Sequence, residues 1–212
     1  MCGRAGRSSG SSCANVARNL AVAGELLRQA RAQGAVVAVL PENFAFMGRG
    51  EADKLAIAEA HGSGPIQACL AEQARMHSLW IVGGTIPLKL PDEPRVAAAC
   101  LVFDGAGREV ARYDKIHLFD VDVPGKLESH RESKAVRPGT RVVTVDTPAG
   151  RLGLAVCYDV RFPELFRELL QQDVAQRMGS VEVDSLLPRA LVAKWVKGAG
   201  VVVAVVAILL AI

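Results

Sequence analysis

Two stretches in the first half of the chain place apolar residues at the 3.6-residue period of an amphipathic helix. They cover residues 15–33, where Gly34 follows as a helix stop, and residues 64–77. Each is followed by a continuous apolar run, AVVAVL at residues 35–40 and LWIVGGTI at residues 79–86. Such runs are typical of strands that are buried on both faces of a sheet.

The second half of the chain contains two hairpin signals. Residues 96–103 and 108–113 flank the turn sequence DGAG, and residues 141–146 and 151–156 flank TPAG. Helices therefore alternate with buried strands at first, and hairpins follow. This order predicts an α/β layered fold with a mixed sheet.

The last part of the chain has a different pattern. Pro163 predicts the start of a helix over residues 164–172, because proline is favoured in the first helical turn. Residues 198–212 (GAGVVVAVVAILLAI) carry no charge. A membrane-spanning helix needs about 20 apolar residues, and valine favours strands. We interpret this segment as a core strand or an exposed apolar end, with a membrane anchor as the alternative.

The composition is that of a globular protein. The chain has 212 residues, of which 50% are hydrophobic and 22% are charged, which is enough for one domain with a sizeable core. The net charge is only +3 and no basic run is interleaved with aromatic residues, so we expect no nucleic-acid partner. Residues 1–14 include a Ser/Gly-rich run and lack an apolar segment. They predict an unstructured start rather than a secretory signal.

The cysteines are spread along the chain, and their number is odd. No CxxC pair occurs, which argues against a disulfide framework and against a zinc site. The four histidines are scattered as well, so we expect no metal. A reducing cytoplasm is the expected compartment. The five cysteines are Cys2, Cys13, Cys69, Cys100 and Cys157.

Three apolar segments lead to an ionisable residue that such a segment would not ordinarily carry. Glu42 lies in VVAVLPENFAF, Lys115 in ARYDKIHLFDVDVPG, and Cys157 in GRLGLAVCYDVRFPEL. A base, a cation and a thiol at strand ends make a complete set for acyl transfer. The carboxylate takes the thiol proton, the sulfur attacks, and the ammonium stabilises the oxyanion.

Each of these residues also has a purely structural interpretation. Glu42 could cap a helix or form an ion pair, and Lys115 could be exposed on an edge strand or pair with Asp114. Cys157 could be a core thiol, because unpaired cysteine is among the most buried residue types. If the helix that begins near Pro163 points its N-terminus at the sulfur, it favours the Cys157 thiolate.

The motifs around these residues resemble those of the nitrilase superfamily, the carbon–nitrogen hydrolases. LPENFAFMG, YDKIHLFDVDVPGK and GLAVCYDVRFPEL match in order, and the resemblance runs from about residue 15 to about residue 171. It is nearest to the amidase branch that contains deaminated glutathione amidase and omega-amidase. The resemblance implies an α-β-β-α sandwich over residues 15–172, a homodimer, and no metal or cofactor.

The resemblance also implies roles for individual residues. Its substrates would be small ω-amides of dicarboxylic or keto acids, cleaved through a cysteine thioester with release of ammonia. Arg161 is a candidate for binding the substrate carboxylate, although it could equally cap the local turn. The resemblance implies that Glu42 is the general base, Lys115 the oxyanion-stabilising lysine and Cys157 the nucleophile. It also implies that Glu132, in HRESK, is the second glutamate and that Tyr158 supplies the backbone oxyanion donor.

Both ends of the chain depart from the family pattern. Residues 1–14 show no strand pattern where the family begins with a strand, and residues 173–212 match nothing in the family's second half. We therefore expect an incomplete sandwich, truncated at both ends, with a divergent apolar tail. The alternative to an active amidase is an inactive remnant or a non-catalytic subunit of a complete partner, associated with a membrane if residues 198–212 act as an anchor.

Overall fold

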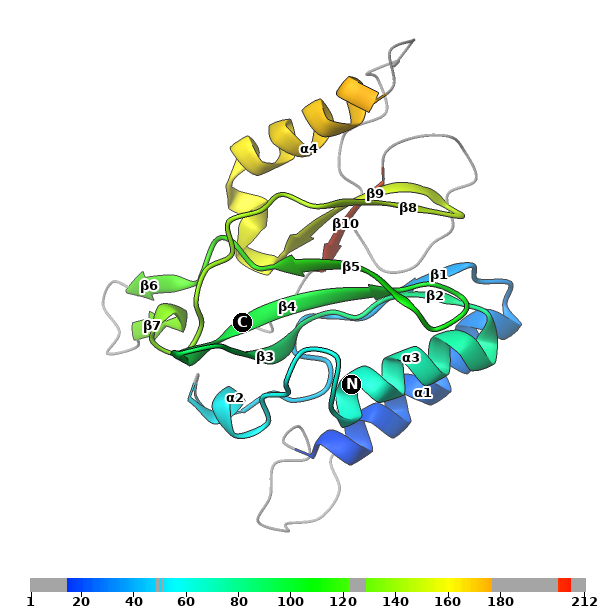
Figure 1. Ribbon diagram of the computed structural model, residues 1–212, viewed down its shortest axis with the longest axis horizontal. Helices are drawn as coiled ribbons and strands as arrows, with labels where there is room; N and C mark the ends of the chain where they lie inside the picture. The colour runs from blue at the N-terminus through cyan, green and yellow to red at the C-terminus, as the bar shows by residue number, and fades with distance from the viewer. Residues whose placement is uncertain (1–14, 49, 51, 123–128, 177–201, 207–212) are drawn as a thin grey trace.

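Four layers of secondary structure are stacked in the order helix, sheet, sheet, helix (Figure 1). The computed structural model describes residues 15–48, 50, 52–122, 129–176 and 202–206. The predicted α-β-β-α sandwich is confirmed. The expected unstructured start and most of the divergent tail lie outside the described residues.

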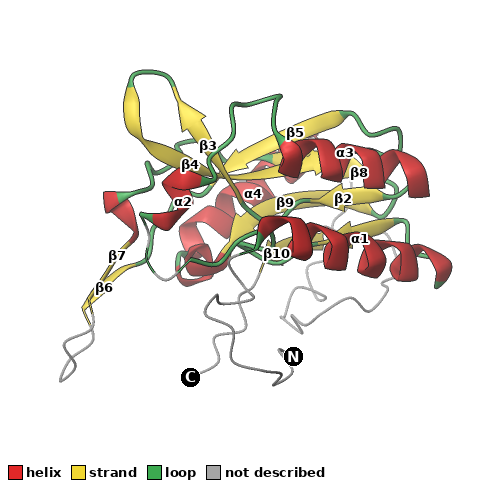
Figure 2. Ribbon diagram, turned by 90° about the horizontal axis from the view of Figure 1, so that it is seen from below, coloured by secondary structure: helices red, strands yellow, loops and turns green. Residues whose placement is uncertain are grey.

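The first helical layer consists of α1 (Val16–Ala32) and α3 (Pro65–His77), which lie side by side against one face of the first sheet (Figure 2). Both helices begin where the sequence predicts. Asn15 caps α1 by accepting a hydrogen bond from the Arg18 N–H at 2.9 Å, and Pro65 opens α3. Their inward residues, including Leu27, pack on the sheet in the larger of the hydrophobic clusters.

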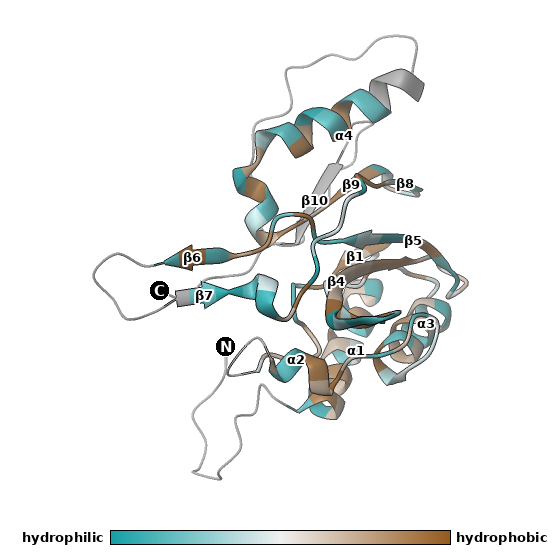
Figure 3. Ribbon diagram, turned by 60° about the vertical axis from the view of Figure 1, so that its left-hand side comes forward, coloured by the Kyte–Doolittle hydropathy of each residue, from teal (hydrophilic) through white to brown (hydrophobic). Residues whose placement is uncertain are grey.

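The first sheet is mixed, as predicted. β1 and β2 are parallel, β4 pairs antiparallel with β2 and β3 on one side, and β5 pairs antiparallel with its other side. Figure 3 shows the hydrophobic character of the long central strand β4. The strands are β1 (Val37–Val39), β2 (Trp80–Val82), β3 (Ile86–Leu90), β4 (Glu93–Phe103) and β5 (Glu109–Asp114).

The apolar run at residues 79–86 is not one strand, because only residues 80–82 form β2 and residue 86 begins β3, which continues beyond the predicted range. The break falls at Gly83 and Gly84, and Gly84 has a φ of +57°. A Cβ atom on Gly84 would collide with the carbonyl oxygen of Pro41, so only glycine allows the two backbone segments to approach so closely. This contact holds the chain just before Glu42 against the end of β2.

The second sheet consists of β8 (Thr144–Thr147), β9 (Gly150–Val156) and β10 (Val202–Val206). The predicted hairpin of β8 and β9 is confirmed, and β10 runs parallel to β9. Residues 202–206 therefore form a strand, while the rest of the apolar segment 198–212 lies outside the described residues. In the described part of the chain, no helix is both long enough and apolar enough to cross a membrane.

Strand β9 is packed on both of its faces. Its inward side chains, Leu152, Leu154 and Val156, meet Cys100 and Tyr113 of the first sheet. On its outer face, α4 (Pro163–Gln176) covers the sheet through Leu165 and Leu169, which pack on Ala155. The predicted helix after Pro163 is thus confirmed and extends beyond residue 172.

Five short elements were not predicted, because none of them has a long periodic pattern. The hairpin of β6 and β7 projects away from both sheets (Figure 2). Two 3₁₀ helices follow strands β7 and β9 directly. The five elements are α2 (Asp53–Ala56), β6 (Asp120–Asp122), β7 (Ser129–Arg131), η2 (Glu132–Lys134) and η3 (Cys157–Arg161).

Candidate active site

Glu42 lies just beyond the end of β1, and its side chain is buried, with only 2% exposed. The segment that carries it is anchored on both sides. The Leu40 N–H donates to the Val82 carbonyl at 2.9 Å, and the Asn43 N–H donates to Thr85 Oγ1 at 2.9 Å. Asn43 has a φ of +55°, so a sharp turn directs the Glu42 carboxylate inward.

Lys115 lies directly after β5 and is also only 2% exposed. Its N–H donates to the Ala98 carbonyl at 3.0 Å, and its own carbonyl accepts from the Gly139 N–H at 2.8 Å. The interpretation of Lys115 as an exposed edge lysine is therefore wrong. Pairing with Asp114 is wrong as well, because the Asp114 carboxylate binds Arg112 at 2.8 Å and 3.0 Å.

Glu132 begins η2 and is 4% exposed. Its Oε2 accepts hydrogen bonds from Lys115 Nζ at 2.8 Å and from the Phe119 N–H at 2.7 Å. Its Oε1 lies 4.0 Å from the Nζ of Lys54, which belongs to α2. Glu132 therefore connects two lysines, and Lys54 is a member of the site that the sequence analysis missed.

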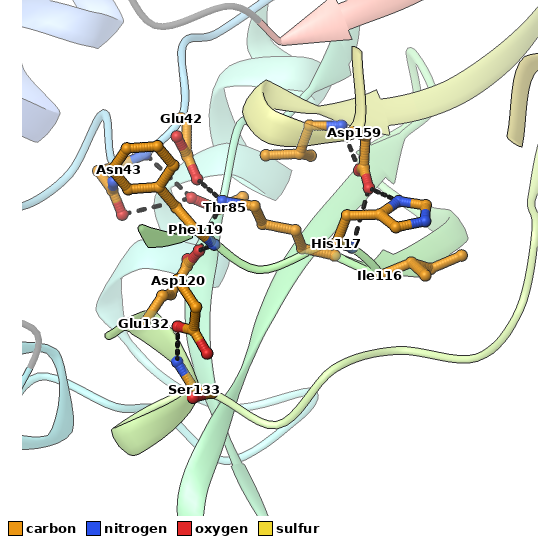
Figure 4. Close-up of polar contacts among 12 residues, drawn as sticks. Glu42, Asn43, Thr85, Ile116, His117, Phe119, Asp120, Glu132, Ser133 and Asp159 are labelled. Atoms are coloured by element: carbon orange, nitrogen blue, oxygen red, sulfur yellow. Dashed lines mark hydrogen bonds and ion pairs between the residues drawn. The ribbon is translucent and has the colours of Figure 1, made fainter. Parts of the chain in front are cut away.

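The Lys115 ammonium lies between two buried carboxylates. It donates to Glu42 Oε1 at 3.0 Å and to Glu132 Oε2 at 2.8 Å, and Figure 4 labels the two glutamates. Burial alone would lower the pKa of Lys115, but the two negative charges and their hydrogen bonds raise it above its ordinary value. The lysine therefore remains a cation inside the protein. Glu42 is thus ion-paired, as its structural interpretation expected, and this pairing leaves its second oxygen free of Lys115.

One carboxylate oxygen of this cluster has no hydrogen bond. The buried Glu42 Oε2 accepts no hydrogen bond of ordinary geometry from the described residues, and the Cys157 thiol is the group that interacts with this carboxylate without such a bond. A buried, unsatisfied oxygen is costly unless the protein uses it. Because Glu42 Oε1 is held by Lys115, Oε2 is the atom available to receive a proton.

Cys157 lies where β9 ends and η3 begins, and it is partly buried. Its φ of +50° lies in the left-handed region, a strained conformation of the kind that presents nucleophiles at strand-to-helix turns. Burial and then the negative charge of Glu42 raise the pKa of Cys157 to about 12, although Lys115 opposes this. A raised pKa favours the neutral thiol, so a base is needed to form the thiolate.

Tyr158 and Arg161 lie on η3, just beyond the nucleophile turn. The Tyr158 ring contacts Phe119 edge-on, with centroids 5.2 Å apart, and its backbone N–H lies in the first turn of η3, where intrahelical acceptors are lacking. Arg161 is exposed, with its guanidinium 5.9 Å from the centre of the Tyr158 ring. Among the described contacts, none joins Arg161 to the buried carboxylates.

Asp159 is a second residue that the sequence analysis missed. It is completely buried and accepts hydrogen bonds from the Val156 N–H, the Tyr113 hydroxyl and His117. A carboxylate two residues after a candidate nucleophile, within the otherwise apolar start of a helix, was the available signal. Within the described ranges, no three His, Cys, Asp or Glu side chains converge in a way that could hold a metal ion.

Comparison with known sequences agrees with this arrangement. Residues 5–180 match the family described as Carbon-nitrogen hydrolase. The chain is 40% identical over 159 residues to deaminated glutathione amidase of Yersinia enterocolitica, covering 74% of this chain and 55% of that protein. It is also 40% identical over 152 residues to omega-amidase NIT2 of Homo sapiens, covering 69% and 51%. The chain thus spans about half the length of these relatives.

Solved structures give the same result. The NitFhit protein of C. elegans superimposes with a TM-score of 0.63 at 36% identity, over 71% of this chain and 36% of that one. An amidase from Nesterenkonia sp. AN1, with acrylamide added at its active-site cysteine, superimposes with a TM-score of 0.59 at 26% identity, over 72% and 56%.

Proposed function

Because the chain belongs to the carbon–nitrogen hydrolase family, we propose that it is an amidase that cleaves a small ω-amide through a thioester on Cys157. The observation that carries this proposal is the buried cluster in which Glu42 and Glu132 hold the Lys115 ammonium beside the thiol. The cluster contains a base, a cation and a nucleophile, and these are the groups that acyl transfer needs.

In the first step, Glu42 Oε2 takes the proton of the Cys157 thiol as the sulfur attacks the amide carbon. A base is required because the raised pKa of about 12 keeps this thiol protonated at neutral pH. The new carbon–sulfur bond turns the carbonyl oxygen into an oxyanion. The Lys115 ammonium and the Tyr158 N–H stabilise that charge.

In the second step, the tetrahedral intermediate collapses. Glu42 gives its proton to the departing nitrogen, the carbon–nitrogen bond breaks, and ammonia leaves a thioester on Cys157. Glu42 then takes a proton from water, whose oxygen attacks the thioester carbon. The carbon–sulfur bond then breaks, Glu42 returns its proton to the departing sulfur to regenerate the thiol, and the acid product loses its own proton to water and leaves as a carboxylate. Throughout the cycle, Glu132 keeps Lys115 in place through the 2.8 Å hydrogen bond.

Two comparisons support the finer parts of the proposal. The relatives named deaminated glutathione amidase and omega-amidase support an amide substrate that also carries a carboxylate. The acrylamide adduct in the Nesterenkonia amidase supports a cysteine as the reacting group. The exposed Arg161 is the residue that we propose for binding the substrate carboxylate.

The test is release of ammonia from the purified chain with two matched substrates, a short ω-amide that carries a terminal carboxylate and a neutral amide of the same length. We expect ammonia from the anionic amide and none from the Cys157→Ala variant. Arg161→Gln should raise KM for the anionic amide and leave KM for the neutral one unchanged. If the well-folded chain releases no ammonia from either amide, a non-catalytic role is favoured instead.

A further inference from the structure

Asp159 accepts four hydrogen bonds although it is completely buried. Its Oδ2 accepts from the Tyr113 hydroxyl at 2.7 Å and from the Val156 N–H at 2.8 Å. Its Oδ1 accepts from the backbone N–H of His117 at 3.0 Å and from His117 Nδ1 at 2.6 Å. A carboxylate has only acceptors, so this histidine must carry its proton on Nδ1.

These partners lie on both sides of the reacting groups. Val156 precedes Cys157 directly, whereas Tyr113 and His117 lie two residues before and two residues after Lys115. Figure 4 shows the His117 ring and the Asp159 carboxylate facing each other, on the far side of the close-up from Glu42. One side chain thus joins the turn of the nucleophile to the loop of the oxyanion-stabilising lysine.

The backbone at Cys157 needs such support. A non-glycine residue with a φ of +50° costs of the order of 1 kcal/mol and persists only where its surroundings hold it. The Val156 N–H bond holds the residue before Cys157, and the His117 ring is stacked on Phe162 with centroids 3.7 Å apart and planes 9° apart. His117, which binds the Asp159 carboxylate, is therefore itself packed against the residue that follows η3.

We propose that Asp159 is a positioning residue that holds the Cys157 sulfur in register with Glu42 and Lys115. It touches neither the substrate nor the reacting atoms. The proposal deepens the amidase function and rests on it, because the register matters only if the sulfur attacks an amide. A displacement of about 1 Å in a reacting group lowers a rate by about 100-fold.

The decisive variant is Asp159→Asn, which keeps the shape and replaces one acceptor oxygen by an amino group. That amino group then faces donors from Val156 or His117, so the turn relaxes. We expect kcat to fall by about 100-fold with KM changed far less. We also expect the pH profile of Cys157 alkylation by iodoacetamide, followed by peptide mass spectrometry, to move towards that of an ordinary thiol with a pKa of about 8.5.

Glu59→Gln is the matched control. Glu59 is also buried, at 6% exposure, and accepts from the Ile66 N–H at 2.6 Å and from the Gln67 N–H at 3.1 Å at the start of α3. Among the described contacts, the Glu59 carboxylate bonds only to Ile66 and Gln67, and neither residue belongs to the catalytic cluster. This variant should lower the melting temperature like Asp159→Asn and leave kcat and the alkylation profile unchanged within about twofold, because its bonds only cap a helix.

Two milder changes test the same network if Asp159→Asn does not fold. Tyr113→Phe removes one hydrogen bond and keeps the ring, so kcat should fall by about tenfold or less. His117→Ala should lose more, and His117→Asn should recover part of that loss, because the asparagine amide can donate to Asp159 as Nδ1 does. If His117 only filled space, His117→Asn would not recover kcat, because asparagine is smaller than histidine.

The alkylation profile separates this proposal from the proposed function. If the wild-type chain releases no ammonia, the amidase proposal fails, but a shifted profile in Asp159→Asn still supports positioning of the sulfur. If the profile of Asp159→Asn, or of Tyr113→Phe where the first variant does not fold, matches the wild type, Asp159 does not position Cys157, whatever happens to kcat. Equal loss of kcat in Glu59→Gln would also overturn the proposal.

Discussion

The middle of β4 and the end of β9 each carry a thiol in the same hydrophobic cluster, and the two thiols differ in what surrounds them. Cys100 and Cys157 both have a pKa raised to about 12. For Cys100 burial is the only cause, whereas Cys157 also feels Glu42 and is opposed by Lys115. If Cys157 is the nucleophile that we propose, its reactivity does not come from a lowered pKa. We propose that it comes from the neighbouring base, which can take the proton, and the neighbouring cation, which can stabilise the resulting charge.

The backbone conformation also differs between the two cysteines. Cys100 lies in a regular antiparallel ladder opposite Tyr113, and its side chain is fully buried in the core. Cys157 leaves the sheet through a left-handed turn that interrupts the ladder. A strand end can combine the rigidity of the sheet with an exposed reacting atom, and the middle of a strand cannot.

The largest expected difference comes from removing each thiol in turn. Cys157→Ala should lower kcat for the anionic amide by at least about 1,000-fold, because no other nucleophile is in place. Cys100→Ala should cost about 1–2 kcal/mol of unfolding free energy through the small cavity it leaves, and should leave kcat unchanged within a few-fold. Ammonia release measures kcat of both variants, and thermal unfolding measures their stability. A loss of activity in Cys100→Ala but not in Cys157→Ala would show that Cys100, and not Cys157, is the reacting thiol.

Glu42→Gln should have the next largest effect. The amide cannot take the thiol proton, so kcat should fall by about 100- to 10,000-fold while the structure is retained. Steady-state kinetics and circular dichroism measure the two quantities. Glu59→Gln again serves as the control for a buried glutamate outside the cluster. Equal kinetics in Glu42→Gln and the wild type would remove Glu42 from the mechanism.

Glu132→Gln should have a smaller effect. Its Oε2 binds the Lys115 ammonium and the Phe119 N–H together, and a glutamine amino group would confront one of these donors. We expect kcat to fall by about 10- to 100-fold, with a pronounced loss of melting temperature because a buried ion pair is broken. Glu93→Gln, at a partly exposed pair with Arg95, should change neither quantity appreciably. Unchanged kinetics in Glu132→Gln would show that Glu42 alone suffices to hold Lys115.

The smallest expected effect concerns stability above pH 9, where the two thiols should behave alike. A raised pKa in the folded state favours the protonated form, so stability is lost as the pH rises from the ordinary thiol pKa of about 8.5 towards 12. Each alanine variant should therefore lose less stability over this range than the wild type, by at most about 1.4 kcal/mol per pH unit. Denaturant titrations at pH 8.0 and about pH 10 measure the difference. A slope change for only one thiol would contradict a raised pKa at the other.

Much of the architecture could be predicted because it is written in local patterns. The periodicity of residues 15–33 and 64–77 and the turn sequences of the two hairpins correspond to α1, α3, β4–β5 and β8–β9. The break between β2 and β3 could not be predicted from the apolar run. It depends on the contact of Gly84 with Pro41, which lies far away in the sequence.

Some residues of the site could likewise be predicted from the sequence, and others could not. Glu42, Lys115 and Cys157 lie in long motifs, and Glu132 was found through the resemblance. Asp159 and Lys54 were missed because their importance comes from partners that only the fold supplies. Tyr113 lies 46 residues from Asp159, and Glu132 meets Lys54 only through the packing of α2. A buried polar network is a property of tertiary structure, so a pattern of single positions does not reveal it.

Trapping of the acyl intermediate tests the central claim most directly. The chain is mixed with the anionic ω-amide, quenched in acid within the first turnover, digested, and its cysteine peptides are weighed. We expect the added mass of the acyl group on the peptide that contains Cys157, an unmodified Cys100 peptide, and no adduct in Cys157→Ala. An adduct on another cysteine, or ammonia release with no adduct on Cys157 at any quench time, would contradict it.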